Sequence, residues 1–392
     1  MSYFDLSPFR KRHLLALLET LDNSRLPLDT AMSHYFRAHK ALGSKDRYTV
    51  SQTVYMLKRW QGAIDVELDQ PITWEARIEA LKHFDAKKTA QNESLSPHVR
   101  TSFPKALFGM LTESLGDEKA FEVALASNER APLFIRTNTL KISRDDLLKR
   151  LEEEEGIKVC SGENSPDSIV FLERVNFFSL DAFKEGLFEV QDENSQKVAE
   201  LVQAKPGDKV LDYCAGSGGK ALAIAPKLKE SGQLFLHDIR IKALDEAKKR
   251  LKRAGIQNAQ RLDPGHKQLK ALKGAVDWVL VDAPCSGTGT LRRNPDLKWK
   301  FDKERFKSLL EEQRDIFEKA LTYVKPKGHI VYATCSLLKE ENEEQIAFFE
   351  EHFKNTYGLT LEKSMHTFPD RDQGDGFFGA VLSVAQNPLA VS

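Results

Sequence analysis

The feature that most constrains the fold is the regular alternation of short apolar runs with helical stretches from residue 207 onward. The apolar runs predict parallel strands at 209–214, 233–239, 259–262, 277–282 and 328–334. Strands that are apolar along nearly their whole length are typical of a parallel sheet whose two faces are both covered by helices. Two later runs, at 361–367 and 376–384, indicate an antiparallel hairpin at one edge of that sheet. The sequence therefore predicts an α/β fold for this part of the chain.

Two further parts precede the sheet. Residues 1–125 are predicted to form a helical domain, because apolar residues recur there at spacings of three and four. The expected helices of this domain are 10–21, 28–41, 46–61 and 74–84. Residues 126–192 are predicted to form a small α+β module. Residues 193–392 are predicted to form the domain that contains the large sheet. The expected strands of the module are 133–136, 168–172 and 187–191, with a helix at 144–155.

The charge balance and the cysteine content exclude several classes of protein. The 392 residues include 58 Lys and Arg and 58 Asp and Glu, so the chain has no overall positive charge. A polyanion could therefore bind only at a local basic patch. No apolar run reaches the roughly 18–20 residues of a membrane span, and the run after Arg10–Arg12 is too short for a secretory signal. Four cysteines without a C-x-x-C pair predict neither a disulfide framework nor a metal site. We expect a cytoplasmic protein.

A glycine-rich turn, residues 214–220, follows the first strand of the sheet. Glycines at such a turn let backbone amides approach a ligand closely. The turn is not a phosphate-binding P-loop, because cysteine stands at 214 where glycine is needed and alanine at 221 where Ser or Thr is needed. It fits a dinucleotide loop and an S-adenosylmethionine loop equally well. Asp238 ends the second strand and suits the ribose of either cofactor, with a surface carboxylate as the ordinary alternative.

Two of the four cysteines follow neighbouring strands at the edge where ligands bind in such sheets. Cys285 lies in Asp-Ala-Pro-Cys after the fourth strand, and Cys335 lies in Thr-Cys-Ser after the fifth. A thiolate that adds to carbon 6 of a cytosine makes carbon 5 nucleophilic toward a methyl sulfonium, whereas hydride transfer has no comparable need for paired cysteines. The pair therefore favours cytosine methylation over a nicotinamide oxidoreductase. Cys160 is expected to be structural, and Cys214 to act through its backbone.

Longer motifs surround the two cysteines. They are D-A-P-C-S-G-T-G at 282–289, L-R-R-N-P-D-L-K-W at 291–299 and Y-A-T-C-S at 332–336, followed by Glu340-Glu341-Asn342. With these motifs, residues 130–385 resemble the Sun/Nop/RsmB family of RNA cytosine-5 methyltransferases. The resemblance implies a Rossmann-like S-adenosylmethionine-dependent methyltransferase sheet. It also implies that the N-terminal helices are similar to a NusB-like RNA-binding domain.

The resemblance implies a role for each matching residue. Cys335 takes the role of nucleophile, Cys285 assists resolution and release of the product, and Asp282 belongs to the catalytic set. The implied cofactor contacts are Cys214, Ala215, Gly216, Ser217, Gly218, Gly219, Lys220, Asp238, Asp263 and Asp282. The chain departs from the family's usual alanine-proline at positions 216–217, and Pro226 is expected to kink or shorten the helix after the loop.

A basic strip at 292–307 directly follows the Asp-Ala-Pro-Cys loop, with seven Lys and Arg against three Asp and Glu. Basic and aromatic side chains beside an active edge can hold phosphates and stack a base, with a solvated loop as the ordinary alternative. The expected RNA contacts are Arg292, Arg293, Lys298, Trp299 and Lys300. The target base must be single-stranded or flipped out to reach Cys335.

Ribosomal RNA is the expected partner, because a NusB-like N-terminal domain favours it. Transfer RNA is the alternative within the family. An RNA-binding ribosome-assembly factor with little turnover is the alternative from another class, and the intact cysteine pair argues against it.

Overall fold

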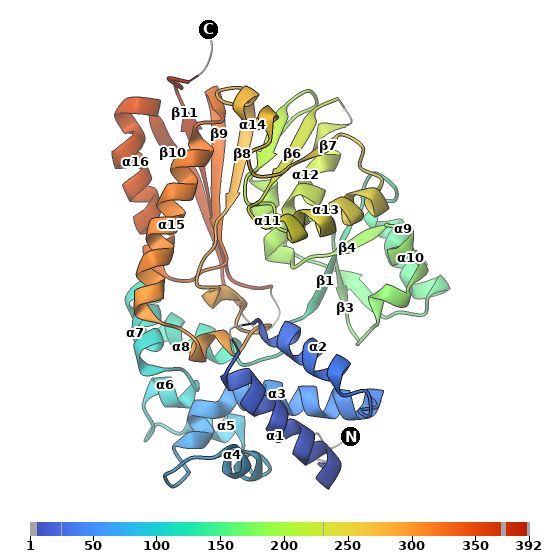
Figure 1. Cartoon of the computed structure of the whole chain (residues 1–392), viewed down its shortest axis with the longest axis vertical. Coiled ribbons are helices and arrows are strands. Elements are labelled where there is room, and N and C mark those ends of the chain that lie inside the picture. The colour runs from blue at the N-terminus through green and yellow to red at the C-terminus, as the bar shows by residue number, and fades with distance from the viewer. Residues whose placement is uncertain (1–5, 25, 230, 370–373, 390–392) are drawn as a thin grey trace. The chain divides into compact units, whose positions relative to one another are not determined.

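A computed structural model describes residues 6–24, 26–229, 231–369 and 374–389. The chain divides into two compact units (Figure 1). The first, called the helical unit below, contains residues 1–130 together with 290–301. The second, the catalytic unit, contains residues 131–289 and 302–392. The segment 290–301 lies within the predicted domain of residues 193–392, but in the structure it groups with the N-terminal helices.

The N-terminal part of the helical unit is made of helices, as predicted. They are α1 (Pro8–Asp22), α2 (Leu28–Ala38), α3 (Ser44–Asp65), α4 (Trp74–Leu81), α5 (Ala86–Gln91), α6 (Pro97–Arg100), α7 (Lys105–Leu115) and α8 (Asp117–Ala126). The start of α1 shows why the sequence folds this way, because Ser7 caps the helix by accepting from the backbone of Arg10 and a proline follows it. Apolar side chains such as Leu14 and Leu57 are fully buried between the helices.

The segment 290–301 is tied into this unit by buried polar contacts. Lys298 donates from Nζ to the backbone oxygen of Arg59 and to Oδ1 of Asn128, both at 2.7 Å. Trp299 donates from its indole to the backbone oxygen of Lys58 at 2.6 Å. Arg59 in turn donates to the backbone oxygen of Arg292 at 3.0 Å. Burial lowers the pKa of Lys298 well below its usual value, and the nearby charge of Arg59 lowers it further.

These contacts correct part of the predicted RNA interface. The prediction that Arg292 and Lys298 hold phosphate is wrong, because their side chains are only 1% and 2% exposed. Trp299 does not stand free to stack a base, since its ring lies where a Cβ on Gly62 would come within 2.7 Å. The number of basic residues in the sequence could not show that two of these side chains are buried.

The other two residues of that strip keep some access to solvent. Lys300 is exposed and pairs with Asp296 at 2.9 Å, and Arg293 is half-buried. For these two side chains, contact with RNA stays a prediction.

We expect Lys298→Met to lower the free energy of unfolding by about 1–3 kcal/mol, because it keeps the volume but leaves buried oxygens without their donor. The control variant Lys303→Met removes an exposed ammonium five residues away and should stay within about 0.5 kcal/mol of the parent. Denaturant unfolding of both proteins measures the difference. If Lys298→Met left stability unchanged and instead flattened the salt dependence of RNA binding, the inward placement of Lys298 would be wrong.

The catalytic unit begins with a small antiparallel sheet in the order β2-β3-β1-β4. Its elements are β1 (Leu133–Thr137), α9 (Arg144–Lys149), β2 (Val159–Ser161), β3 (Ser168–Phe171), α10 (Asp181–Lys184) and β4 (Phe188–Val190). The three predicted strands are present, and the predicted helix at 144–155 is α9 continued by a wider π turn. The prediction missed β2, which has only three residues at the sheet edge and carries the exposed Cys160.

The large sheet has seven strands in the order β10-β11-β9-β8-β5-β6-β7. Its strands are β5 (Lys209–Asp212), β6 (Gln233–His237), β7 (Ala259–Leu262), β8 (Val276–Asp282), β9 (Val324–Thr334), β10 (Leu359–Thr367) and β11 (Phe377–Val384). The pairs among β5 to β9 are parallel, and β10 and β11 are antiparallel at one edge. The predicted α/β sheet and its edge hairpin are confirmed.

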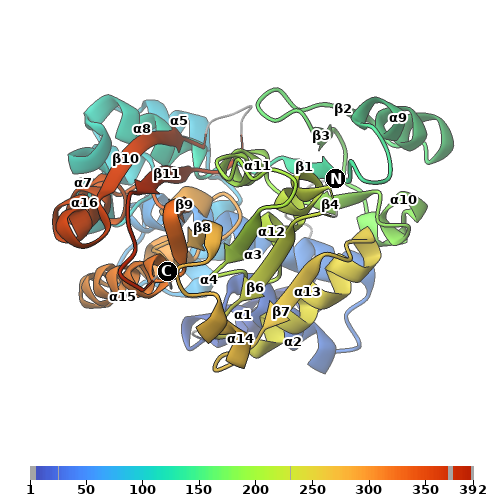
Figure 2. The same ribbon diagram turned by 90° about the horizontal axis from the view of Figure 1, so that it is seen from above.

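Helices cover both faces of this sheet (Figure 2). They are α11 (Glu193–Glu200), α12 (Gly219–Ile224), α13 (Ile241–Ala254), α14 (Lys267–Ala271), α15 (Lys303–Leu321) and α16 (Glu343–Tyr357). Alternation along β8 sends Val279 into the core beneath α14, α15 and α16, and Leu280 into the core beneath α11, α12 and α13. As expected from Pro226, α12 ends at Ile224 and a 3₁₀ turn follows. No helix in the described ranges is long and apolar enough to span a membrane.

Candidate active site

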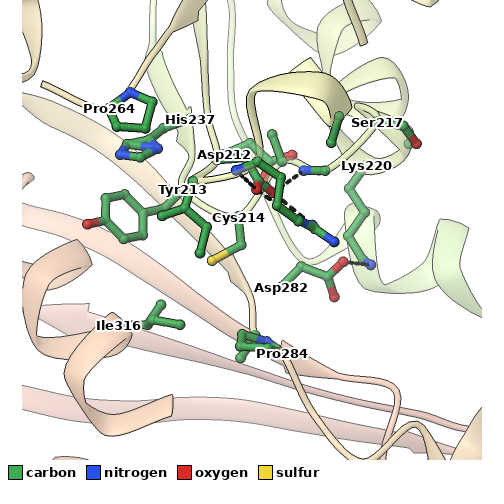
Figure 3. A pocket seen from close by; sticks show the side chains of 18 of the residues that line it. Asp212, Tyr213, Cys214, Ser217, Lys220, His237, Pro264, Asp282, Pro284 and Ile316 are labelled. Carbon is green, nitrogen blue, oxygen red and sulfur yellow. Dashed lines mark hydrogen bonds and ion pairs between the residues drawn. The ribbon is translucent and has the colours of Figure 1, made fainter. Parts of the chain in front are cut away.

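A cavity of about 1190 Å³ opens at the carboxyl ends of β5, β6, β8 and β9 in the catalytic unit (Figure 3). The predicted site residues that line it are Cys214, Ala215, Gly216, Ser217, Gly219, Lys220, Asp238, Asp282, Cys285 and Cys335. Parallel strands end at one edge of a sheet, so residues from four separate stretches of sequence meet there. The structure therefore brings the predicted cofactor loop and both predicted cysteines to one cavity.

The glycine turn after β5 has a backbone that requires glycine. Gly216 and Gly218 have φ angles of 52° and 81°, in the left-handed region that favours glycine. A Cβ on Gly218 would also lie 3.1 Å from the Cβ of Ala247 in α13. Gly218 itself does not line the cavity, so its role is to let the turn pack closely against this helix.

Asp238 holds the same turn from the end of β6. Its carboxylate accepts from the backbone of Gly216 at 2.8 Å and from the guanidinium of Arg240 at 2.9 Å. Burial alone would raise the pKa of Asp238, but hydrogen bonds from Arg240 and Gly216 lower it below its ordinary value. The group is therefore a fixed anion at the cavity wall. Each of its oxygens already accepts two hydrogen bonds, so a ribose hydroxyl would take the place of a donor from the exposed guanidinium of Arg240.

Asp212, the last residue of β5, is a site residue that the sequence analysis did not single out. It lines the cavity and is 1% exposed, and no described residue hydrogen-bonds its Oδ1. Burial and the negative charge of Asp282 raise the pKa of Asp212 to about 8. Its sequence signal is the same strand-end carboxylate that identified Asp238, and Figure 3 shows it in the wall of the pocket.

Lys220 and Asp282 form an ion pair at the cavity, with Nζ and Oδ2 2.5 Å apart (Figure 3). Burial by itself would lower the pKa of Lys220. The charge and hydrogen bond of Asp282, with smaller contributions from Cys335 and Asp212, raise the pKa above its usual value. The ammonium therefore stays charged and lies within electrostatic reach of Cys335.

The sulfur atoms of Cys285 and Cys335 lie 3.3 Å apart. Both side chains are partly buried and both line the cavity. The hydrogen bond to Cys335, together with burial, raises the pKa of Cys285 well above the usual value of a thiol. At neutral pH Cys285 is therefore a protonated thiol beside the sulfur of Cys335.

Buried polar groups fix the loop that carries Cys285. Glu341 accepts from the backbone of Ser286 at 2.8 Å and from its hydroxyl at 2.5 Å, and Gln313 donates to the same carboxylate at 2.9 Å. Burial raises the pKa of Glu341 in spite of these donors. In the sequence, Glu341 is part of a motif that by itself predicts no role for this side chain.

The loop that carries Cys335 has its own supports. Asn342 donates from its side chain to the backbone oxygen of Ser336 at 3.0 Å and accepts from the hydroxyl of Thr334 at 2.6 Å. The backbone of Gly289 donates to the backbone oxygen of Cys335 at 2.9 Å, which joins the two cysteine loops directly.

Asp263 lies beside the cavity without lining it. Its carboxylate is paired with Arg261, whereas the next three residues, 264–266, do line the cavity. Contact between Asp263 and a cofactor stays a prediction. The described part of the chain holds no group of three or more His, Cys, Asp or Glu side chains arranged to bind a metal.

Comparison with known proteins identifies the family. Residues 199–383 match the family described as 16S rRNA methyltransferase RsmB/F, and residues 103–177 match the one described as Methyltr_RsmF/B-like, ferredoxin-like domain. Ribosomal RNA small subunit methyltransferase B of Klebsiella pneumoniae subsp. pneumoniae is 32% identical over 316 residues, which are 78% of this chain and 72% of that protein. The chain belongs to the RsmB/F family.

Other relatives agree with this assignment. The protein of the same name from Proteus mirabilis is 34% identical over 261 residues, 66% of this chain, and the match spans only 60% of the Proteus protein. Among solved structures, PH0851 is 25% identical with a TM-score of 0.76, over 96% of this chain and 99% of that one.

S-adenosylmethionine is the cofactor of RsmB/F methyltransferases, and the cavity fits it. The glycine turn leaves space for close backbone approach, Asp238 is a fixed carboxylate at the wall, and Oδ1 of Asp212 receives no hydrogen bond from the described residues. This oxygen can accept from a hydroxyl or an ammonium group, both of which S-adenosylmethionine carries.

Asp212 predicts a pH dependence of stability. Its pKa is about 8 in the folded chain and about 4 when unfolded, so between these values the folded state holds a proton that the unfolded state has lost. Stability falls as pH rises through this window, by up to about 1.4 kcal/mol per pH unit. We expect Asp212→Asn to remove this part of the decline when denaturant unfolding is measured at about pH 5.5 and pH 7.5.

The control variant is Asp145→Asn, whose side chain is 82% exposed in the same unit and should leave the decline as in the parent. An unchanged decline in Asp212→Asn would contradict the raised pKa.

Proposed function

We propose that this chain methylates carbon 5 of a cytosine in RNA through a covalent bond between Cys335 and carbon 6. The observation that carries the proposal is the pair of thiols 3.3 Å apart in the same cavity as the cofactor turn. Methyl transfer to an oxygen or to an amino nitrogen needs no such pair, because those atoms have a lone pair of their own. Carbon 5 of cytosine becomes a nucleophile only after addition at carbon 6.

The cofactor would be held by the turn at 214–219, by Asp238 and by Asp212. When bound, S-adenosylmethionine supplies an electrophilic methyl group. The chain's own residues must make carbon 5 able to accept it, and must afterwards restore the aromatic ring.

Cys335 carries out the addition to carbon 6 of the cytosine. Its thiolate forms a bond to carbon 6, and the displaced electron pair gives carbon 5 enamine character. The ammonium of Lys220 lies within electrostatic reach of this sulfur. Asp282, held by Lys220, is a carboxylate in the same cavity, and we assign it to contact with the target base.

Cys285 assists the release of the methylated product from Cys335. After methylation, a base removes the proton from carbon 5, the bond between carbon 6 and sulfur breaks, and its electrons return to Cys335. A protonated Cys285 at 3.3 Å can donate its hydrogen to the departing thiolate. The raised pKa of Cys285 keeps that hydrogen in place at neutral pH, and it also keeps Cys285 from competing as a nucleophile.

Small-subunit ribosomal RNA is the proposed substrate, because relatives that align with 66% and 78% of this chain carry that activity in their names. The target cytosine must leave its stack to enter the cavity. Bisulfite sequencing of ribosomal and transfer RNA, from cells with and without the protein, tests this choice. A lost signal only in transfer RNA would replace the substrate and leave the chemistry unchanged.

The two cysteines are expected to fail at different steps. Cys335→Ala cannot form the bond to carbon 6, so it should lose methylation by at least about a thousandfold and form no adduct. Cys285→Ala keeps the nucleophile but lacks the hydrogen donor for its departure, so a protein–RNA adduct should accumulate. Denaturing electrophoresis with labelled RNA detects the adduct, and incorporation of labelled methyl groups measures turnover.

The parent protein, which should show turnover with little adduct, is the control for both variants. An adduct in Cys335→Ala that is absent from Cys285→Ala would reverse the two roles. Full methylation by both variants would rule out covalent catalysis by this pair.

A further inference from the structure

Arg250 connects the cofactor turn to a helix that lies outside it. From α13 its Nη1 donates to the backbone oxygen and to the hydroxyl of Ser217, both at 3.0 Å. Ser217 is the exposed residue between Gly216 and Gly218, and both it and Arg250 line the cavity. Because glycines flank this residue on both sides, the backbone there has wide conformational freedom, and contacts must restrict it. Asp238 holds the turn at Gly216, and Arg250 holds it one residue further on.

Glu189, on β4 of the small sheet, fixes the guanidinium of Arg250. Its carboxylate accepts from Nε of Arg250 at 3.0 Å and from Nη2 of Arg253 at 2.5 Å. The side chain of Glu189 is 4% exposed, so this pairing takes place away from bulk water, where a charge-assisted hydrogen bond is strong. Arg253 lies one turn further along α13, with its guanidinium 4.0 Å from the ring centre of Phe183, and does not line the cavity.

The end of α13 is docked firmly on the same small sheet. Asn138 donates from its side chain to the backbone oxygens of Gly186 and Ala254, both at 2.8 Å. Lys141 donates to the backbone oxygen of Arg253 at 2.8 Å. A Cβ on Gly186 would lie 2.1 Å from the same oxygen of Arg253, so the two backbones approach as closely as glycine allows. The Glu189 carboxylate is therefore held at a fixed position relative to α13.

We infer that Glu189 and Arg250 are positioning residues for S-adenosylmethionine, and that the small sheet sets the shape of the cofactor turn through them. Glu189 does not touch the cavity and acts only through Arg250, which fixes the peptide at Ser217. The affinity for the cofactor thus depends on a carboxylate outside the large sheet. The inference rests on S-adenosylmethionine as cofactor and not on the cytosine chemistry, so calorimetry without RNA tests it independently of that chemistry.

Arg250→Met keeps the length of the side chain and removes its donors. We expect it to raise the Kd for S-adenosylmethionine about tenfold, the effect of losing one hydrogen bond to a charged group. The rate at saturating cofactor should stay within about twofold, because the reacting groups are untouched. The matched control is Arg253→Met, which removes an arginine from the same helix and the same carboxylate without touching the turn, and should leave the Kd unchanged.

Glu189→Gln tests whether the carboxylate acts through Arg250. Alone it should raise the Kd for S-adenosylmethionine severalfold, and in the Arg250→Met background it should raise it no further, since residues that act in series are not additive. Thermal unfolding without cofactor reports any general loss of stability in each variant. Equal Kd changes in Arg250→Met and Arg253→Met, or additive effects of Glu189→Gln and Arg250→Met, would overturn the inference.

Discussion

The parallel pairing of β8 with β9 is the constraint on which the site depends. In this register Asp282 lies opposite Ala333, so both strands end at the same level of the sheet. Cys285 follows three residues after one strand end, and Cys335 follows directly after the other. Two thiols that are 50 residues apart in the sequence are thereby brought to 3.3 Å. Hydrogen bonds and apolar packing along two buried strands bring the two cysteine loops together, and buried polar groups within the loops then set the distance between the sulfur atoms.

Buried polar groups hold the loops that follow the strands. Burying such groups is unfavourable, and the hydrogen bonds that they form offset this free-energy cost. A carboxylate as buried as that of Glu341 is unfavourable unless donors surround it, and it receives them from Ser286 and Gln313. Asn342 gives the same kind of support to the loop after β9. These groups contribute no reacting atom. They hold the two sulfur atoms at the wall of the cavity.

Much of the fold and of the site could be predicted from the sequence because the signals are local. Apolar runs that alternate with helices are enough to predict the parallel sheet, and a turn with three glycines directly after β5 is enough to predict a cofactor loop. The predictions that fail concern contacts between residues that are far apart in the sequence. The sequence predicts that the basic strip at 292–307 faces RNA, and only the fold shows that Lys298 is buried among helices from the other end of the sequence. The contact between Glu189 and Arg250 joins residues 61 apart, and neither residue belongs to a motif.

The most direct test of covalent methylation by Cys335 uses the unmodified protein with RNA that carries 5-fluorocytidine at the target position. Fluorine at carbon 5 cannot leave as a proton does, so the bond between protein and carbon 6 cannot be resolved after methyl transfer. Digestion of the trapped complex and mass spectrometry of the RNA-linked peptide identify the attached residue. We expect a methylated nucleotide linked to Cys335. A link to Cys285, or turnover of this RNA with no linked peptide at all, would contradict it.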